Sequence, residues 1–236
     1  MSHQKLLIVK RKLNPYLILL FFVFPAFTNC TKEALPEPET VITDIDGFVY
    51  HSVNIGTQVW LKENLNTTRY RDGTVIPLIT QNSAWANSTT GAYSSYDNNN
   101  ANVSIYGALY NWYAVVDSRG LCPAGWHVPT NDEWTTLTTY LGGLIVAGGK
   151  MKKEGTEHCL EPNTGADNSS GFTGIGSGVR DISGVYASLR QLQYLWSSSE
   201  YSPTHGISRK LFYDFPSVSF SGNYKQSGFS VRCIKD

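Results

Sequence analysis

Apolar and polar residues alternate near the start of what we expect to be the folded part of the chain. The alternation covers residues 48–55, and a second short apolar run ends at Leu61. Asp46-Gly47 precedes the first run and Gly56 separates the two, and both are turn signals. The pattern predicts a β-hairpin or meander.

A helix is predicted to begin at Thr130. Thr130 at the N-cap and Glu133 three residues later form a capping box, in which each side chain bonds the backbone amide of the other residue. Trp134, Leu137 and Leu141 then follow at the spacing of one buried helix face, and two glycines supply the stop signal.

Three other segments have weaker patterns. Residues 106–115 carry apolar side chains at helical spacing and predict a short helix, whereas the Asn-, Ser- and Thr-rich residues 82–104 predict a loop. Residues 195–236 alternate aromatic and polar side chains between turn signals. They predict several short strands, the last at residues 229–234.

The first 29 residues have the pattern of a secretory leader. Basic residues precede an almost wholly apolar run at residues 13–24, which is shorter than the roughly 20 residues that span a bilayer. The run ends near FTNC, which resembles a bacterial lipobox whose cysteine, here Cys30, becomes the lipidated first residue. Asn29 departs from that pattern, so cleavage without lipidation is the alternative.

The residues after Cys30 agree with an anchored protein. Residues 30–42 are polar and contain proline, which predicts an extended tether, and Lys32-Glu33 resembles the surface-export signals of Bacteroidota lipoproteins. We expect Cys30 to carry the lipid that anchors the protein in a membrane. The expected location is the outer membrane or cell surface of a Gram-negative bacterium.

Composition and charge narrow the function classes. Of the 19 basic residues, four lie in the leader, so 15 remain against 19 acidic ones and the net charge is −4. Nucleic acid is therefore excluded as a partner, because phosphate binding needs clustered Lys and Arg. Aromatic residues make up 13% of the chain and charged residues 16%, which is typical of a loop-rich extracellular domain. We expect one domain, residues 43–236.

The cysteines predict one disulfide. With Cys30 assigned to lipid, Cys122, Cys159 and Cys233 remain in an oxidising compartment, and an odd number leaves a free thiol or an intermolecular bond. Cys122 and Cys233 each border a distinctive motif, and we predict that they pair. The bridge would close a loop of roughly 110 residues, for which chain entropy gives about 4–5 kcal/mol. Cys159 is predicted to be a small buried residue rather than a nucleophile.

The segment from Leu121 to Leu137 brings together residue types that often serve in catalysis. Cys122, His127, Asp132 and Glu133 lie within a dozen residues. The helix start explains both carboxylates, since Glu133 completes the capping box and Asp132 faces the helix dipole. We interpret His127 as a packed or hydrogen-bonded residue, so no catalytic residue is predicted.

Several segments resemble the Fibrobacter succinogenes major paralogous domain, a family of secreted or lipid-anchored domains of Bacteroidota and Fibrobacteres. The resemblance covers roughly residue 43 to the C-terminus. The segments that carry it are DIDGFVYHSVNIGTQVWLKENLNTTRYRDGTVIP, TGAYSSYDNN, YGALYNWYAV, LCPAGWHVPTNDEWTTLTTYLGG, GGKMKKEGT, PNTGADNSSGF, LWSSSEYS and GFSVRC.

Two shorter similarities imply a fold. HVPTNDEW resembles a segment of formylglycine-generating-enzyme-like domains, and GFSVRC is similar to their terminal strand. The resemblance implies an α+β fold of the C-type-lectin-like or formylglycine-generating-enzyme-like kind, loop-rich, with short helices around small twisted antiparallel sheets. The enzymes use a reactive cysteine pair near that strand, whereas only Cys233 is present here, so no copper is predicted.

One tripeptide resembles part of a calcium site. Glu161-Pro162-Asn163 resembles the sugar-and-calcium tripeptide of C-type lectins, but its downstream partner motif is absent and calcium needs six to eight oxygen ligands. Neither a metal nor another cofactor is therefore predicted.

Three function classes remain. We expect a non-enzymatic surface domain for adhesion or ligand display, which binds a protein or glycan through loops. The alternatives are a carbohydrate-binding module of a glycan-utilisation system and, less favoured, an enzyme that uses His127 and Glu133. The predicted ligand contacts are Trp85, Tyr93, Tyr96 and Tyr201, although any of these rings fits a core equally well, Trp85 above all.

Overall fold

Two five-stranded sheets dominate the computed structural model, which describes residues 41–236. The strand orders are β1-β2-β3-β12-β6 and β11-β10-β9-β7-β8, and β4 pairs with β5. The strands are β1 Val41–Thr43, β2 Val49–Ile55, β3 Gln58–Leu61, β4 Tyr93–Ser94, β5 Leu109–Tyr110, β6 Trp126–His127, β7 Ser177–Arg180, β8 Tyr186–Leu189, β9 Leu192–Ser202, β10 His205–Phe212, β11 Val218–Tyr224 and β12 Ile234–Lys235. The helices are α1 Asn82–Ala86, α2 Asn100–Tyr106, α3 Trp112–Val115, α4 Asn131–Tyr140 and α5 Leu144–Met151, with a 3₁₀ turn at Tyr96–Asn98.

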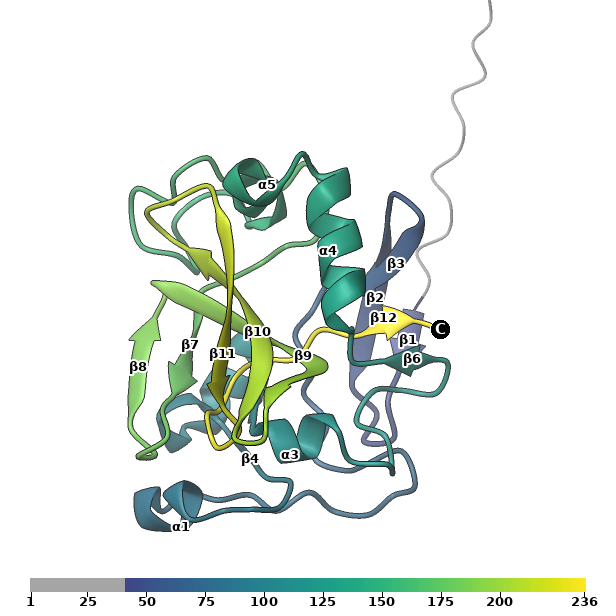
Figure 1. Cartoon of the computed structure of the whole chain (residues 1–236), viewed down its shortest axis with the longest axis vertical. Helices are drawn as coiled ribbons and strands as arrows, with labels where there is room; N and C mark the ends of the chain where they lie inside the picture. The colour runs from purple at the N-terminus through teal and green to yellow at the C-terminus, as the bar shows by residue number, and fades with distance from the viewer. Residues whose placement is uncertain (1–40) are drawn as a thin grey trace, which may run out of the picture. The chain divides into compact units, whose positions relative to one another are not determined.

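The first sheet joins distant parts of the chain. The predicted hairpin is confirmed as β2 and β3, which turn at Gly56 with a φ of +62°. β12, close to the C-terminus, lies between β3 and β6, with Ile234 opposite both Trp60 and His127. Figure 1 shows this strand in yellow beside the purple and blue strands of the hairpin.

The second sheet is built on three long strands, β9, β10 and β11, which form an antiparallel meander. They confirm the prediction of several strands in the last part of the chain. α4 and α5 contact β9 and β11 at one end of the meander (Figure 1). A mixture of short helices and twisted sheets therefore makes the fold α+β.

The predicted helix after Thr130 is present as α4. Thr130 Oγ1 accepts from the Glu133 amide, and the Glu133 carboxylate accepts from the Thr130 amide, so the capping box is complete. Trp134, Leu137 and Leu141 are buried as expected. Gly142 follows with a φ of +100°, which favours glycine and ends the helix.

The interior contains two apolar clusters. In one, Trp60 of β3 packs against Trp134 of α4, with ring centroids 4.7 Å apart, and Phe172 completes the group. The other cluster surrounds Cys122 and Cys233 and includes Trp196 against Phe229, with centroids 4.4 Å apart. Much of the high aromatic content is therefore core.

The prediction of one helix over residues 106–115 is wrong. α2 ends at Tyr106 and α3 begins at Trp112, with β5 between them. Gly107 separates the elements at a φ of +76°, and a side chain there would place its Cβ 2.9 Å from the Leu65 carbonyl oxygen. Close approach of a distant segment therefore overrides the local helical spacing.

Two further predictions need correction. Residues 82–104 are not only loop, because they contain α1, β4, the 3₁₀ turn and most of α2. Residues 229–234 do not form one strand, since Phe229 bonds Tyr110, Ser230 bonds Tyr194, and the Cys233 carbonyl accepts from Leu61. The segment changes partner almost at every residue, and only Ile234–Lys235 belongs to a strand.

The predicted leader, Cys30 and most of the predicted tether lie outside the described residues. Within residues 41–236, no helix has the length and apolar character needed to cross a membrane.

Candidate functional site

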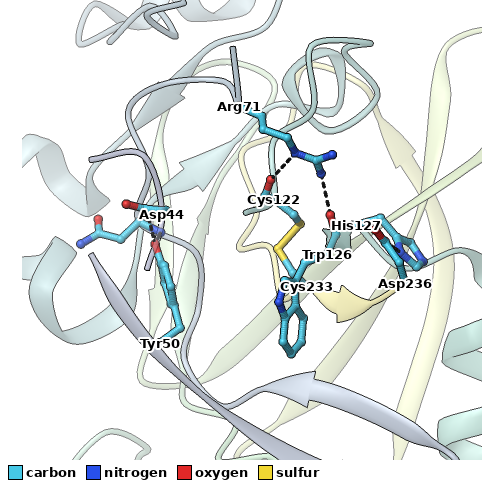
Figure 2. Close-up of a disulfide and its surroundings, with 9 residues drawn as sticks. Asp44, Tyr50, Arg71, Cys122, Trp126, His127, Cys233 and Asp236 are labelled. Carbon is cyan, nitrogen blue, oxygen red and sulfur yellow. Dashed lines mark hydrogen bonds and ion pairs between the residues drawn. A yellow bond between two sulfur atoms is a disulfide. The ribbon is translucent and has the colours of Figure 1, made fainter. Parts of the chain in front are cut away.

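The segment 121–137 is held in place by a disulfide and an arginine. Cys122 and Cys233, 111 positions apart, form the disulfide expected from the sequence. Arg71 Nε donates to the Cys122 carbonyl at 3.2 Å and Arg71 Nη2 to the Trp126 carbonyl at 2.7 Å (Figure 2). The disulfide therefore connects the chain before α4 to the C-terminal segment. Arg71 holds the carbonyls of Cys122 and Trp126 in place.

His127 is engaged at both ring nitrogens. Nε2 lies 2.9 Å from Glu133 Oε1 and Nδ1 lies 2.7 Å from Asp236 Oδ1. Burial opposes the ring's positive charge, but the bonds to Asp236 and Glu133 outweigh it and raise the pKa of His127. The imidazolium is thus stabilised by hydrogen bonds to two carboxylates.

Both carboxylate oxygens of Glu133 also have hydrogen-bond partners. Its Oε2 accepts from the Thr130 amide at 2.7 Å and from the Thr130 hydroxyl at 2.9 Å, while Oε1 meets His127. Burial raises the pKa of this carboxyl, and the bonds from Thr130 and His127 more than reverse the effect, so the pKa is lowered. The apparent acid–base pair is part of the helix start.

The remaining reactive types do not assemble into a second site. Cys159 is buried and outside any disulfide, and burial raises the pKa of its thiol. Asn163 of the lectin-like tripeptide is also buried, and its amide donates to the carbonyls of Lys153 and Gly155. Among residues 41–236, no group of three His, Cys, Asp or Glu side chains is placed to hold a metal ion.

The prediction that Trp85 contacts ligand is wrong. Trp85 is fully buried in α1, and the Arg180 guanidinium lies over its ring, 4.4 Å from the centroid. Arg180 is itself buried and donates to the carbonyls of Ile79, Thr80 and Gly184. Trp85 therefore belongs to the packing of the fold.

Tyr93 and Tyr96 are half-buried. The ring of Tyr93 in β4 packs against Tyr110 with centroids 6.2 Å apart. Tyr96 packs against Tyr186 at 5.3 Å and also covers Gly178, where a Cβ would lie 2.6 Å from the Tyr96 ring. Neither ring offers a free face comparable with that of Tyr201.

Tyr201 is the predicted contact that stands on the surface, and two other exposed rings lie on the same sheet face. Tyr201 in β9, Phe220 in β11 and Tyr224 in β11 are 64%, 55% and 48% exposed. Phe220, Gly222 and Tyr224 occupy every second position of β11, so all three residues point to one face of the sheet. A Cβ at Gly222 would lie 2.3 Å from Tyr201 Cδ1, which shows that the Tyr201 ring rests on this glycine.

We call this surface, made of Tyr201, Phe220, Tyr224 and His205, the aromatic strip. His205 in β10 faces Tyr224 across the strands, with ring centroids 4.3 Å apart, and its Nδ1 meets the hydroxyls of Thr204 and Ser202 at 2.8 and 3.2 Å. Phe220 and Tyr224 are four residues, or roughly 13 Å, apart along β11, and the Tyr201 ring rests on Gly222 midway between them. The strip is therefore a row of flat apolar surfaces with a polar end.

The aromatic strip begins beyond the part of the sheet face that packs against α4 and α5. On the same face, Leu211 and Val218 are buried in the core beneath the helices, and Arg209 is the next residue outward. Arg209 is buried, bonds Asn131 at the start of α4, and lies 5.1 Å from the centroid of Phe220. One sheet face thus continues from covered core to exposed aromatic surface.

The sequence reasoning identified Tyr201 but missed Phe220, Tyr224 and His205. A signal was present, because Phe220-Ser-Gly-Asn-Tyr224 places two aromatics on one face with a glycine between them. Val218 continues the same alternation and is buried, so the alternation alone does not mark where exposure starts.

These features define a class: a disulfide-bonded α+β domain in which His127 and Glu133 bond within the fold and one sheet face carries three exposed aromatic rings. Residues 53–235 match the model of the Fibrobacter succinogenes major domain, and the chain belongs to this family. No curated protein and no solved structure matches the chain.

Proposed function

We propose that this protein is a cell-surface lipoprotein whose domain binds an extended glycan without converting it, and that the aromatic strip is the binding surface. The observation that carries the proposal is the row of three exposed rings on one sheet face. Isolated exposed apolar residues are ordinary, but rings gathered on one surface are typical of interaction sites.

The geometry of the strip favours a glycan over a compact ligand. The apolar face of a sugar ring packs well on a flat aromatic ring. Three rings spread over roughly 13 Å of β11 suit several units of an extended chain better than a compact ligand. His205, Ser202 and Thr204 supply polar groups at one end. Adhesion to a protein ligand is the other outcome of the test.

The contacts of His127 and Glu133 support a non-enzymatic role. Both nitrogens of His127 and both oxygens of Glu133 already have partners within the domain. A general base needs a free acceptor near its substrate, and an enzyme that uses these two residues would first have to break the start of α4.

Anchoring through Cys30 completes the proposal. Lipid on Cys30, followed by the polar tether, would hold the domain at the outer membrane or cell surface, and two or more acyl chains give stable attachment. Labelling with a lipid precursor tests this step: wild type should be labelled and Cys30→Ser should not. An unlabelled wild type would refute the anchor and leave the binding site untouched.

We also propose that the α+β arrangement is a C-type-lectin-like variant related to formylglycine-generating-enzyme-like domains. The resemblance of the Leu121–Leu137 segment and the small antiparallel sheets with short flanking helices support this relation. An experimental structure of the domain, compared with both fold families, would test it.

A glycan array tests the ligand class. The Cys30→Ser protein should bind a group of related extended glycans, equally with and without chelator, since calcium is not part of the proposed site. The Tyr201→Ala/Phe220→Ala variant should lose that signal. Binding to a protein ligand with no glycan signal would replace the glycan proposal with adhesion.

A further inference from the structure

A groove elsewhere on the domain shares no lining residue with the aromatic strip. Its volume is about 430 Å³, and it opens between the start of β2, the segment after β3, α2 and the loop at residues 153–158. Pockets that hold small molecules commonly measure about 300–1,000 Å³. The groove is therefore large enough for a small organic ligand.

Part of the groove lining is apolar and solvent-accessible. Phe48 and Val49 at the start of β2 and Ile105 of α2 line it, and all three are exposed. Leaving such side chains in water has a cost that grows with apolar area, at roughly 25 cal/mol per Å². A ligand with an apolar part would remove that cost.

The charged groups of the groove are mostly cationic. Lys62, Lys153 and Arg232 line it, and Glu63 is the carboxylate among the lining residues. Both oxygens of Glu63 are bound to His51, Oε1 to the ring Nδ1 and Oε2 to the backbone amide, each at 2.8 Å. Residues 41–236 contain 14 basic and 16 acidic side chains, so the groove reverses the sign of the domain's net charge.

Arg232 places a positive charge under the groove floor. Its side chain is fully buried, with Nη1 donating to the Phe172 carbonyl, Nη2 donating to Asn64 Oδ1 at 2.7 Å, and Nε without a partner. No carboxylate within residues 41–236 makes an ion pair with it. Burial lowers its pKa to about 9, so it stays cationic at neutral pH. A buried charge acts strongly on its surroundings because little water screens it.

Lys153 offers direct contact at the rim. Its ammonium lies 3.2 Å from Glu157, whose side chain is largely exposed. Exposed ion pairs of this kind contribute little free energy, with a median of about 0–1 kcal/mol. An acidic group of a ligand can therefore take the place of Glu157 at Lys153.

We propose that this groove binds a small amphipathic organic anion, with the apolar part against Phe48, Val49 and Ile105 and the acidic group between Lys153 and the floor above Arg232. The site is independent of the aromatic strip and of the proposed glycan ligand. Three features meet in this one cavity: an apolar lining, a cationic rim, and a buried arginine that makes no ion pair within residues 41–236.

The test compares two fluorescent probes that differ by one charged group. 8-Anilinonaphthalene-1-sulfonate carries an apolar ring system and a sulfonate, and N-phenyl-1-naphthylamine has the same rings without the sulfonate. The Cys30→Ser protein should bind the sulfonate at one saturable site and the neutral probe at least about fivefold more weakly. Equal affinity for the two probes, or no saturable binding of the sulfonate, would overturn the proposal.

Matched variants locate the site. Lys153→Met should weaken the sulfonate about fivefold, whereas Lys235→Met, which removes the same charge from exposed β12, should stay within about twofold. Ile105→Glu should weaken it at least about tenfold, because it removes apolar wall and adds like charge. Its control is Ile145→Glu at the exposed start of α5.

The pattern of losses decides between the groove and other apolar surfaces. Sensitivity to Ile145→Glu or to Tyr201→Ala, with Ile105→Glu and Lys153→Met unchanged, would place the probe elsewhere and overturn the assignment. Circular dichroism of each variant distinguishes a lost site from a lost fold, and the two controls carry the same chemical changes at exposed positions. Loss of glycan binding without loss of probe binding would leave this inference intact.

Discussion

The segment at Leu121–Leu137 and the aromatic strip differ in whether their side chains already have partners. In the segment, Cys122 is in a disulfide, and His127 and Glu133 bond each other and their neighbours. In the strip, Tyr201 and Phe220 expose more than half of their surface. Residue types that often serve in catalysis thus bond within the domain, and aromatic rings form an exposed surface.

Residue type is therefore a weaker guide than partners in space to which side chains are available. A histidine between two carboxylates resembles a catalytic group in a one-dimensional pattern. Its partners in space are the helix N-cap system and Asp236.

Removal of the disulfide should have the largest effect. The Cys122→Ala/Cys233→Ala variant should lose about 4–5 kcal/mol in the free energy of unfolding, because the bridge restricts a loop of 111 positions in the unfolded chain. Urea denaturation under oxidising conditions measures the loss. A change below about 1 kcal/mol would mean that the bridge contributes little to the scaffold.

One tryptophan and one tyrosine substitution compare the stability contribution of a core ring with that of a surface ring. Trp85→Ala should lower the free energy of unfolding by about 3–5 kcal/mol, because it opens a cavity under Arg180. Tyr201→Ala should change it by less than about 0.5 kcal/mol. Equal losses in denaturation experiments would contradict the assignment of Tyr201 to a free surface.

Glu133→Ala tests the structural role of the apparent catalytic acid. We expect a loss of about 1 kcal/mol, because the substitution removes one half of the capping box. Ligand binding by the folded variant should be unchanged. Normal stability together with abolished activity on a substrate would favour an enzyme.

The pH dependence of stability should show the smallest effect. The raised pKa of His127 stabilises the fold below its ordinary value of 6.5, and this contribution is lost as pH rises through the folded-state pKa. The lowered pKa of Glu133 acts in the opposite direction, since its contribution is present above 4.5 and is lost as pH falls through the folded-state pKa. The pair should therefore stabilise most between about pH 5 and 6.

His127→Gln measures that contribution. The side chains of His127 and Glu133 are both about one-third exposed, so water screens their interaction. The variant should therefore differ from wild type in the free energy of unfolding by only ~0.5 kcal/mol near pH 5.5, and by less near pH 9. Denaturation curves at the two pH values supply the comparison. A difference that grows with pH would mean that the neutral ring is the stabilising form.

Local signals made part of this structure predictable. The capping box and the helix face after it are encoded within a dozen residues, and α4 forms as predicted. The β2–β3 hairpin and the meander of β9 to β11 also follow from alternation and turns. Each of these features depends on contacts between near neighbours in the sequence.

Apart from the Cys122–Cys233 disulfide, which the motifs around each cysteine indicated, the features that depend on distant contacts were not predictable. Gly107 breaks the expected helix because Leu65 approaches it, and Trp85 is buried because Arg180, 95 positions later, covers it. For the strip, the alternation of β11 predicts one face but not the point where helix packing stops. Long-range packing, rather than propensity, decides which aromatic rings remain available to a ligand.

The most direct test of the central claim is the affinity of three proteins for the glycan with the strongest array signal. Relative to wild type, Tyr201→Ala/Phe220→Ala should weaken binding at least about 30-fold, as expected when central aromatic contacts are removed, and His127→Gln should stay within about twofold. Unchanged affinity in the double variant, with binding lost in His127→Gln, would contradict the account and return the function to the Leu121–Leu137 segment.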